Sequence, residues 1–405
     1  MSGYVHKPEQ WDKEAALLWR AGLRDPALAK ATATLEGLEE HYADAFIQPG
    51  FYLFQLDRFD EAVAVLERGA ALFPHHPMLL LSLGSAYNRA RRHTQAIPWL
   101  ERFLGLGIID ASAFDALASS HADTGNLMKA GLFGTMALAE KDKATAARHG
   151  TPRLAKVRPG KKKQIIAFTL FGSEPRYLRG ALHNVLAARD LYPGWTCRFY
   201  VDDSVDATFL EAIEVEGAEL VRDDSGNRDL RHLLTRRFLV ADDRKVGSFM
   251  VRDCDSVVNA REAAAVREWI DSGLPFHVMR DWWTHTDPIL AGMWGGIAGV
   301  FPDMAGRLAV FSGDKPLSTN WDQYFLRDQL WPAIRDDVIV HDRCYPSHRA
   351  RPFPTPTPSG REHVGQNEYV SDRAGQAAAL AAFAEKVPAL RLAEPQPVKL
   401  QFRIG

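Results

Sequence analysis

The most chemically informative stretch of the chain is FMVRDCDS, residues 249–256, because it places two aspartates directly after an apolar run. Asp253 and Asp255 are two residues apart, so in extended backbone both carboxylates project to the same side while Cys254 points away. Two neighbouring carboxylates repel each other, and a bound cation offsets that cost. Oxygen ligands of this kind suit Mg²⁺ or Mn²⁺, which can in turn bridge the diphosphate of a substrate. An isolated Asp-x-Asp sequence also occurs in solvated loops, so the surrounding residues determine whether it indicates a metal site.

Around this pair, apolar runs alternate with helical segments. Strands are expected at 165–172, 196–203, 218–224 and 246–256, with helices between them. This pattern predicts an α/β fold with a mostly parallel sheet and helices on both faces. Ligands of such sheets bind beyond the carboxyl ends of the strands. No GxGxxG follows the first strand and no GxxxxGK[ST] occurs, which disfavours a dinucleotide oxidoreductase and a P-loop NTPase.

Further polar residues follow the aspartates in a definite order. They are an Arg280–Asp281 pair, a loop rich in Trp, His and Gly at 282–296, a helix opened by Asp322 and Gln323, and a short strand ending in His341. With this order, residues 163–365 resemble glycosyltransferases of the GT-A type and look closest to bacterial transferases of surface or capsular polysaccharide. The resemblance implies that the DxD aspartates hold, through a divalent metal, the diphosphate of a nucleotide-sugar donor.

The resemblance and the chemistry of sugar transfer assign roles to individual residues, because metal and cationic groups stabilise the charge that grows on the leaving diphosphate. The candidate metal ligands are Asp253, Asp255 and His341. The candidate donor-binding residues are Phe171, Gly172, Arg237, Arg252, Asp253, Gly295 and Gly296. The candidate catalytic residues are Asp322, Asp281 and Gln323, and the candidate acceptor-binding residues are His285 and Trp294. Each has a structural alternative: a buried histidine, core tryptophan packing, a plain glycine turn or an ordinary ion pair. Whether the reaction inverts or retains the sugar's configuration stays open.

The first third of the chain carries an internal repeat. Ala62, Ala96 and Ala130 are spaced by 34 residues, and twelve positions before them lie Gly50, Gly84 and Ala118. Small residues at these positions let paired helices approach closely, and residues 40–142 resemble tetratricopeptide repeats. Such repeats imply either a docking groove for a protein partner or a packing element for self-association.

Composition sets the domain plan and removes several classes. We expect helical repeats at 1–145, a linker at 146–162, a GT-A-like domain at 163–365 and a C-terminal helix and tail at 366–405. The 405 residues hold 49 Lys and Arg against 51 Asp and Glu, a net charge of −2, which disfavours disorder and nucleic-acid binding by overall positive charge. Three scattered cysteines offer neither a zinc ribbon nor a disulfide framework. No secretory signal and no transmembrane segment is apparent, so we expect a cytoplasmic protein, with peripheral attachment to the inner membrane as an alternative.

These features lead to one main hypothesis and two others. The main one is a metal-dependent glycosyltransferase that moves a sugar from a nucleotide-sugar donor, a UDP- or GDP-sugar, to a glycan, lipid-linked or protein acceptor. In this hypothesis the repeat domain recruits the acceptor or joins subunits. The second is a repeat scaffold whose α/β domain is non-catalytic. A nucleotidyltransferase also uses paired aspartates and a metal, but FGSEPRYLRG after the first strand lacks a glycine- and lysine-rich phosphate loop.

Overall fold

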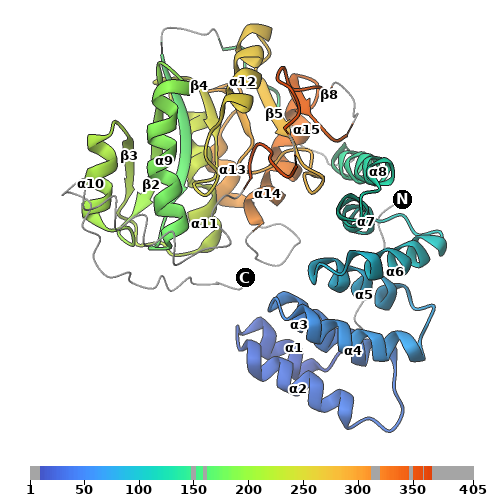
Figure 1. The fold of residues 1–405 in the computed structure, drawn as a ribbon. Helices are drawn as coiled ribbons and strands as arrows, with labels where there is room; N and C mark the ends of the chain where they lie inside the picture. The colour runs from blue at the N-terminus through green and yellow to red at the C-terminus, as the bar shows by residue number, and fades with distance from the viewer. Residues whose placement is uncertain are drawn as a thin grey trace. The chain divides into compact units, whose positions relative to one another are not determined.

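The computed structural model describes residues 10–146, 152–157, 162–311, 320–345, 350–358 and 360–366. The chain divides into two compact units, and the division falls between Ala144 and Thr145. One unit is built from helices alone, and the other is built around a sheet (Figure 1). Among the helices of the described residues, none combines the length and apolar character needed to cross a bilayer.

The first unit is a series of helical hairpins. Its helices are α1 (Lys13–Arg20), α2 (Arg24–Glu36), α3 (Ala43–Gln55), α4 (Phe59–Leu72), α5 (Pro77–Arg89), α6 (His93–Gly105), α7 (Ala111–Asp123) and α8 (Leu127–Ala146). The first helices of three hairpins begin at 43, 77 and 111, and the second helices begin at 59, 93 and 127. Every step is 34 residues, so the predicted helical repeat is confirmed. The α1–α2 hairpin precedes this register and does not follow it.

Glycines set the closeness of the paired helices. A Cβ at Gly50 would lie 2.7 Å from Leu66 Cδ2, and one at Gly84 would lie 2.6 Å from Leu100 Cγ. Both distances are below van der Waals contact, so a larger residue would force the helices apart. The buried leucines therefore pack directly on the backbone of the neighbouring helix, as the small residues predicted.

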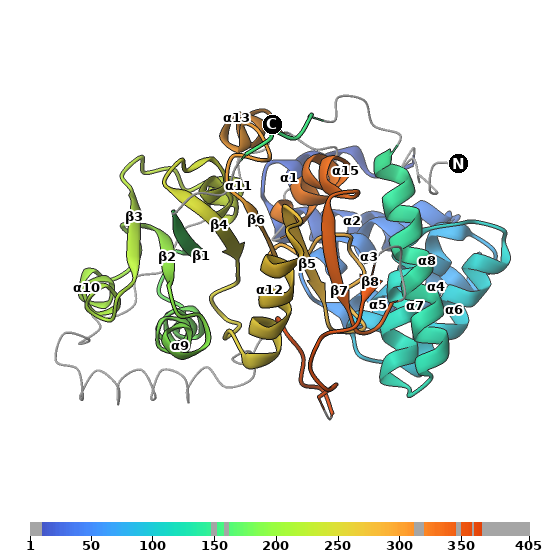
Figure 2. The same cartoon turned by 90° about the horizontal axis from the view of Figure 1, so that it is seen from above.

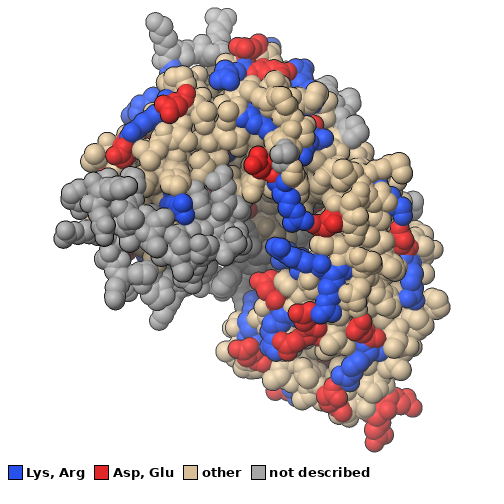
Figure 3. Space-filling view, viewed as in Figure 1, with Lys and Arg blue, Asp and Glu red and all other residues tan. Residues whose placement is uncertain are grey.

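Ion pairs connect successive hairpins at their turns. The Arg92 guanidinium lies 2.7 Å from the Asp60 carboxylate, and that of Arg89 lies 3.6 Å from Asp57. Figure 3 shows basic and acidic side chains interspersed over this unit, without a broad field of one sign on that face. These arginines thus pair with the preceding repeat, and each exposed pair adds only a small stabilisation.

The second unit contains an eight-stranded sheet in the order β3-β2-β1-β4-β6-β5-β7-β8. The strands are β1 (Lys163–Leu170), β2 (Trp195–Asp202), β3 (Glu219–Asp223), β4 (Val246–Val251), β5 (Phe276–Arg280), β6 (Trp294–Ile297), β7 (Val338–Asp342) and β8 (Ala350–Arg351). All neighbouring pairs are parallel except the two pairs made by β6. The predicted mostly parallel sheet is therefore confirmed.

Strand β6 corrects one expectation. Residues 282–296 were expected to form a single glycine-rich loop, but the end of this segment is a central, antiparallel strand between β4 and β5. Gly295 pairs with Met250, and Gly296 pairs with Phe249. A Cβ at Gly295 would lie 2.6 Å from the Phe249 carbonyl oxygen, and one at Gly296 would lie 2.8 Å from the Phe276 ring. The glycines are therefore needed for close packing inside the sheet.

Helices and short helical segments cover both faces of the sheet. They are α9 (Pro175–Leu191), α10 (Ala207–Val215), α11 (Leu230–Thr235), a 3₁₀ helix (Arg236–Asp242), α12 (Ala260–Ser272), α13 (Met304–Val310), α14 (Trp321–Phe325), a π-helical turn (Leu326–Leu330) and α15 (Trp331–Ile334). Figure 2 shows α9, α10 and α12 on one face and α13 and α15 on the other. Along β1, Ile166 and Phe168 pack in the core beneath the first group, whereas Ile165 and Ala167 pack in the opposite core. This alternation explains why the strand reads as a continuous apolar run.

The segments that flank the sheet unit are described in part. Leu154 and Val157, from the expected linker, pack on the second core, and the Ala155 amide donates a 2.8 Å hydrogen bond to the Val300 carbonyl. The expected C-terminal helix and tail lie outside the described residues beyond Gln366.

Candidate functional site

Charged residues gather where the parallel strands end. Asp202 closes β2, and Asp253 and Asp255 follow β4 after Arg252. Arg228 forms ion pairs with Asp202 and with Asp203, so the two carboxylates beyond β2 share one guanidinium. Beyond β4, Asp253 is paired with a different arginine, Arg237.

Arg237 joins two carboxylates that belong to different elements. The arginine lies in the 3₁₀ helix, its Nη1 donates to Asp253 Oδ1 and to the Arg252 carbonyl at 2.8 Å, and its Nη2 donates to Asp322 Oδ2 at 2.9 Å. Arg237 and Asp322 are buried, whereas the Asp253 side chain is 47% exposed. Burial raises the pKa of Asp322 to about 6, and the charge of Asp253 adds to that rise, while Arg237 acts in the opposite direction.

The two DxD carboxylates also influence each other. Burial raises the pKa of Asp255 to about 6, the negative charge of Asp253 raises it further, and Arg176 counteracts part of the effect. Burial likewise raises the pKa of Tyr177 to about 12, with Asp255 as the next cause. Negative charge at this strand end is thus only partly balanced by the side chains around it.

Asp253 and Asp255 fit a divalent cation in one particular binding mode. Within the described residues, no group of three His, Cys, Asp or Glu side chains is arranged to hold a metal ion. Mg²⁺ is commonly held by one or two protein carboxylates, with substrate phosphates and water completing its coordination. Two neighbouring carboxylates at a strand end match this mode, and a closed cage of protein ligands does not.

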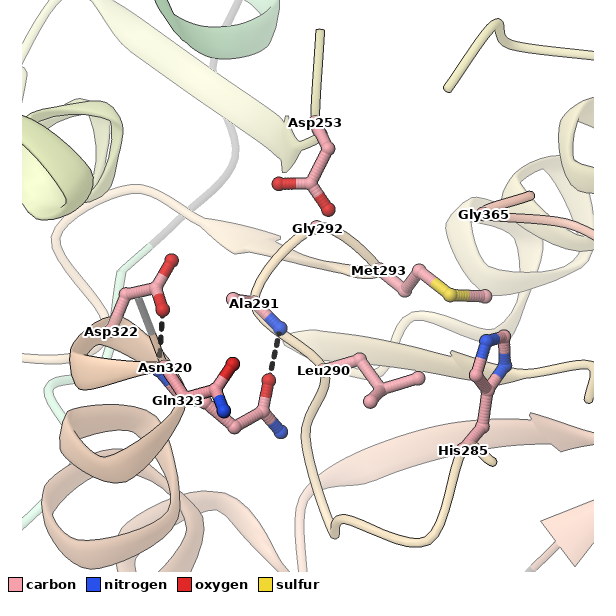
Figure 4. Close-up of a pocket in the computed structure, with 10 residues that line it drawn as sticks. All are labelled: Asp253, His285, Leu290, Ala291, Gly292, Met293, Asn320, Asp322, Gln323 and Gly365. Carbon is pink, nitrogen blue, oxygen red and sulfur yellow. Dashed lines mark hydrogen bonds between the residues drawn. The ribbon is translucent and has the colours of Figure 1, made fainter. Parts of the chain in front are cut away.

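Beside Asp253 lies a pocket of about 220 Å³ (Figure 4). It is lined by Asp253, His285, Leu290, Ala291, Gly292, Met293, Asn320, Asp322, Gln323 and Gly365. A Cβ at Gly292 would lie 2.0 Å from Asp253 Oδ2, so only glycine lets this carboxylate lie against the loop. Gln323 Oε1 accepts a 2.9 Å hydrogen bond from the Ala291 amide, and its Nε2 donates to the Ile289 carbonyl. Gln323 thus fixes the loop that forms one wall.

His285 lies at the end of the pocket away from Asp322 (Figure 4). Its Nδ1 accepts a 3.0 Å hydrogen bond from the Asp281 amide. Burial lowers the pKa of His285 to about 3, helped by the neighbouring His363. The imidazole is therefore neutral at neutral pH.

Of the candidates from sequence, the structure brings Asp253, Asp322, Gln323 and His285 together around the pocket, with Arg237 directly behind Asp253 and Asp322. Asp255 follows on the same strand end. Phe171 and Gly172 follow β1 without lining this pocket, and the Gly172 amide donates a 2.7 Å hydrogen bond to Ser204 Oγ.

Two charged candidates prove to be structural. Asp281 is fully buried, and both its oxygens accept 2.9 Å hydrogen bonds from Arg261. Arg252 is buried with its Nε donating to Glu262 at 3.0 Å. Neither lines the pocket, so the catalytic expectation for Asp281 and the donor-binding expectation for Arg252 are corrected.

The candidates on β6 and β7 are corrected as well. Trp294 is 1% exposed and packs edge-on against Phe249 and Phe238, which makes it a core residue and not an acceptor platform. Gly295 and Gly296 lie within the sheet rather than against a ligand. His341 is fully buried, with Nδ1 2.8 Å from His277 and Nε2 3.3 Å from Glu268. Both ring nitrogens of His341 are engaged there, so it is not a third ligand beside the aspartates.

Several pocket residues carry no chemical signal in the sequence. Leu290, Ala291 and Met293 are apolar, and Gly365 belongs to a proline-rich segment. Gly292 is the exception, since a glycine in an otherwise apolar run could have marked a close approach to Asp253.

Comparison with known proteins concerns the first unit. No protein family and no curated protein matches the chain. Among solved structures, it is similar to MamA from Desulfovibrio magneticus RS-1 (22% identity, 33% of this chain and 75% of that chain, TM-score 0.30). It is also similar to a tetratricopeptide repeat protein from Parabacteroides merdae (17%, 31% and 49%, TM-score 0.29) and to one from Thermus thermophilus (23%, 31% and 69%, TM-score 0.27). The first unit is a helical repeat domain. Its 34-residue register shows this independently of the comparisons, which at these scores carry no argument about function.

Proposed function

We propose that the sheet unit is a metal-dependent glycosyltransferase of GT-A type, which transfers a sugar from a nucleotide-sugar donor to a glycan, lipid-linked or protein acceptor. The observation that carries the proposal is the half-exposed Asp253 carboxylate at the end of β4, facing a pocket and sharing Arg237 with the buried Asp322. The mostly parallel sheet supports it, because ligands of such sheets bind at this edge.

In this proposal, Asp253 and Asp255 hold Mn²⁺ or Mg²⁺ together with the donor diphosphate. The cation supplies positive charge where negative charge develops on the leaving nucleoside diphosphate. Arg237 positions Asp253 and Asp322 relative to each other and contributes a fixed positive charge.

Asp322 is the remaining candidate for the catalytic carboxylate, because Asp281 is buried in an ion pair with Arg261. Asp322 lines the pocket and sits in the first turn of α14, where the Gln323 amide donates a 2.8 Å hydrogen bond to its Oδ1. In an inverting reaction it would accept the proton of the acceptor hydroxyl. In a retaining reaction it would line the sugar face opposite the leaving group.

Donor binding tests the proposal. Purified protein is heated with UDP-, GDP-, CMP- and dTDP-sugars, each with and without Mn²⁺. A donor at about 100 times its Kd should add about 2.7 kcal/mol, or several degrees in Tm. The shift should require Mn²⁺ and disappear in Asp253→Asn, but persist in Asp271→Asn, which alters an exposed aspartate on α12. The absence of any shift across all donors would refute the proposal.

A second candidate function is a repeat scaffold, favoured by one observation on α8. Leu127, Met128, Leu132 and Met136 are 53%, 83%, 57% and 37% exposed, and the last three are four residues apart on one helix face. Exposed apolar faces of this kind suit association with a protein or a second copy. Light scattering of the wild type and of Leu132→Glu tests self-association. If the protein self-associates through this face, the wild type should have a mass above that of one chain, and the variant should have a lower mass. A scaffold without enzymatic activity would also retain its cellular role when both Asp253 and Asp255 are replaced by Ala.

A further inference from the structure

The pocket beside Asp253 has two chemically different ends (Figure 4). One end presents carboxylates and side-chain amides, from Asp253, Asp322, Asn320 and Gln323. The other end presents Leu290, Met293 and the His285 ring. Its volume of about 220 Å³ is enough to admit one sugar ring.

All ionised side chains in the pocket lining are acidic. Asp253 and Asp322 are the charged residues among those that line it. The guanidinium behind them, on Arg237, is buried and already donates to both carboxylates and to a backbone carbonyl. One positive charge therefore serves two negative ones, so these side chains alone, before any metal ion or donor binds, leave the pocket negative.

The opposite end offers no positive charge from the described residues. His285 Nδ1 accepts a hydrogen bond from the Asp281 amide, so the proton of the neutral ring lies on Nε2. The ring can therefore offer one uncharged N–H donor. Burial keeps the pKa of His285 at about 3, well below the range in which it would become a cation. Arginines that lie close to this loop do not line the pocket: Arg261 is paired with Asp281, Arg280 is paired with Asp342 at 2.6 Å, and Arg343 stacks on Trp282 and donates to the Glu362 and Pro358 carbonyls.

We propose that the transferred sugar is uncharged, a neutral hexose or its N-acetyl derivative, and not a uronic or sialic acid. This inference rests on the proposed glycosyltransferase function and adds the substrate class. The hydroxyls of a neutral sugar can donate to the Asp322 carboxylate and to Gln323 Oε1, and its apolar face can pack on Leu290 and Met293. With the metal ion held by Asp253, Asp255 and the donor diphosphate, a sugar carboxylate would instead meet the Asp322 carboxylate, and no described residue of the pocket lining supplies a cation to pair with it, which disfavours its binding.

Titration calorimetry with matched donors tests the inference in the presence of Mn²⁺. UDP-glucose is compared with UDP-glucuronate, and GDP-mannose with GDP-mannuronate, so that each pair differs only at the C6 carboxylate. Bare UDP and GDP give the affinity due to the nucleotide, and CMP-sialate is a further acidic donor. We expect the neutral member of the pair that fits the base to bind about tenfold more tightly, or better, than its acidic counterpart.

Each outcome separates the inference from the function on which it rests. Equal or tighter binding of an acidic donor, CMP-sialate included, would overturn the neutral-sugar inference while leaving the glycosyltransferase proposal in place. No binding of any nucleotide or sugar nucleotide would overturn both. If the inference holds, Leu290→Lys should reduce or reverse the preference by adding a cation to the apolar end, and Leu290→Met should preserve it. Unchanged discrimination in Leu290→Lys would count against a charge-based origin.

Discussion

Arg237 and Asp322 are 85 positions apart in the sequence, yet the arginine Nη2 donates a 2.9 Å hydrogen bond to the aspartate Oδ2 inside the protein. Both side chains are at most 6% exposed. A buried pair of this kind differs from the surface pairs of the helical repeat, because removing one partner leaves the other charge without compensation.

The first prediction concerns this pair. Arg237→Met leaves Asp322 buried and unpaired, so the free energy of unfolding should fall by about 3–5 kcal/mol in urea denaturation. The double variant Arg237→Met with Asp322→Asn should recover part of that loss, because the buried carboxylate is also removed. A cost below about 1 kcal/mol for the single variant would mean that the pair behaves like an exposed one.

The second prediction concerns the loop against Asp253. Gly292→Ala places a Cβ where Asp253 Oδ2 now lies, so the carboxylate must move. We expect Mn²⁺-dependent donor affinity to fall about tenfold or more, measured by calorimetry, because metal ligation tolerates little displacement. The matched control is Gly105→Ala at the end of α6, where a Cβ meets nothing within 4 Å and donor affinity should be retained. Equal affinities for the two variants would remove Asp253 from the metal site.

The third prediction concerns acid stability. The folded pKa of His285 is about 3 against an ordinary value near 6.5, so the unfolded chain takes up this proton first as the pH falls. The contribution of neutral His285 to the free energy of unfolding is therefore complete above pH 6.5, and it is lost progressively as the pH drops toward 3. Between pH 7 and pH 5 the wild type should lose up to about 2 kcal/mol more than His285→Asn in urea denaturation. His75→Asn, at an exposed position, should keep the wild-type pH dependence, and identical slopes for all three proteins would contradict the assignment.

The fourth prediction concerns the helical repeat. Gly84→Ala introduces a Cβ 2.6 Å from Leu100 Cγ, so we expect a loss of about 1–3 kcal/mol despite the better helix propensity of alanine. Leu100→Ala alone should also destabilise, by about 2–5 kcal/mol, because it leaves a cavity. In the double variant the new methyl group fills part of that cavity. The double variant should therefore lose less unfolding free energy than the sum of the losses in the two single variants. Simple additivity in thermal unfolding would mean that the two residues are not in contact.

Much of the fold could be predicted because its signals are local and repeated. The 34-residue spacing of Ala62, Ala96 and Ala130 reports the same packing requirement three times, and all three are fully buried. The apolar runs before Asp202 and Asp253 mark parallel strands buried on both faces. The positions of these aspartates at the carboxyl ends of the strands followed from their place directly after apolar runs in a sheet expected to be parallel.

The errors share one physical cause, which is a distant partner. Asp281 and Arg252 are polar residues in a promising order, and nothing near them in sequence announces that α12 supplies Arg261 and Glu262 to neutralise them. Trp294 and its glycines were ambiguous for the same reason. A single sequence does not say which strand a short glycine-containing segment will pair with. Here the segment pairs with β4 on one side and with β5 on the other.

Strand β6 joins the two halves of the sheet. On one side lie β3, β2, β1 and β4, and on the other β5, β7 and β8; β6 pairs with β4 through four residues and with β5 through three. Because β4 and β5 do not pair with each other and each pairs with β6, the sheet is continuous only through this short strand. The segment that lines the pocket at residues 290–293 leads directly into β6, so we expect a substitution that weakens β6 to displace that wall from Asp253.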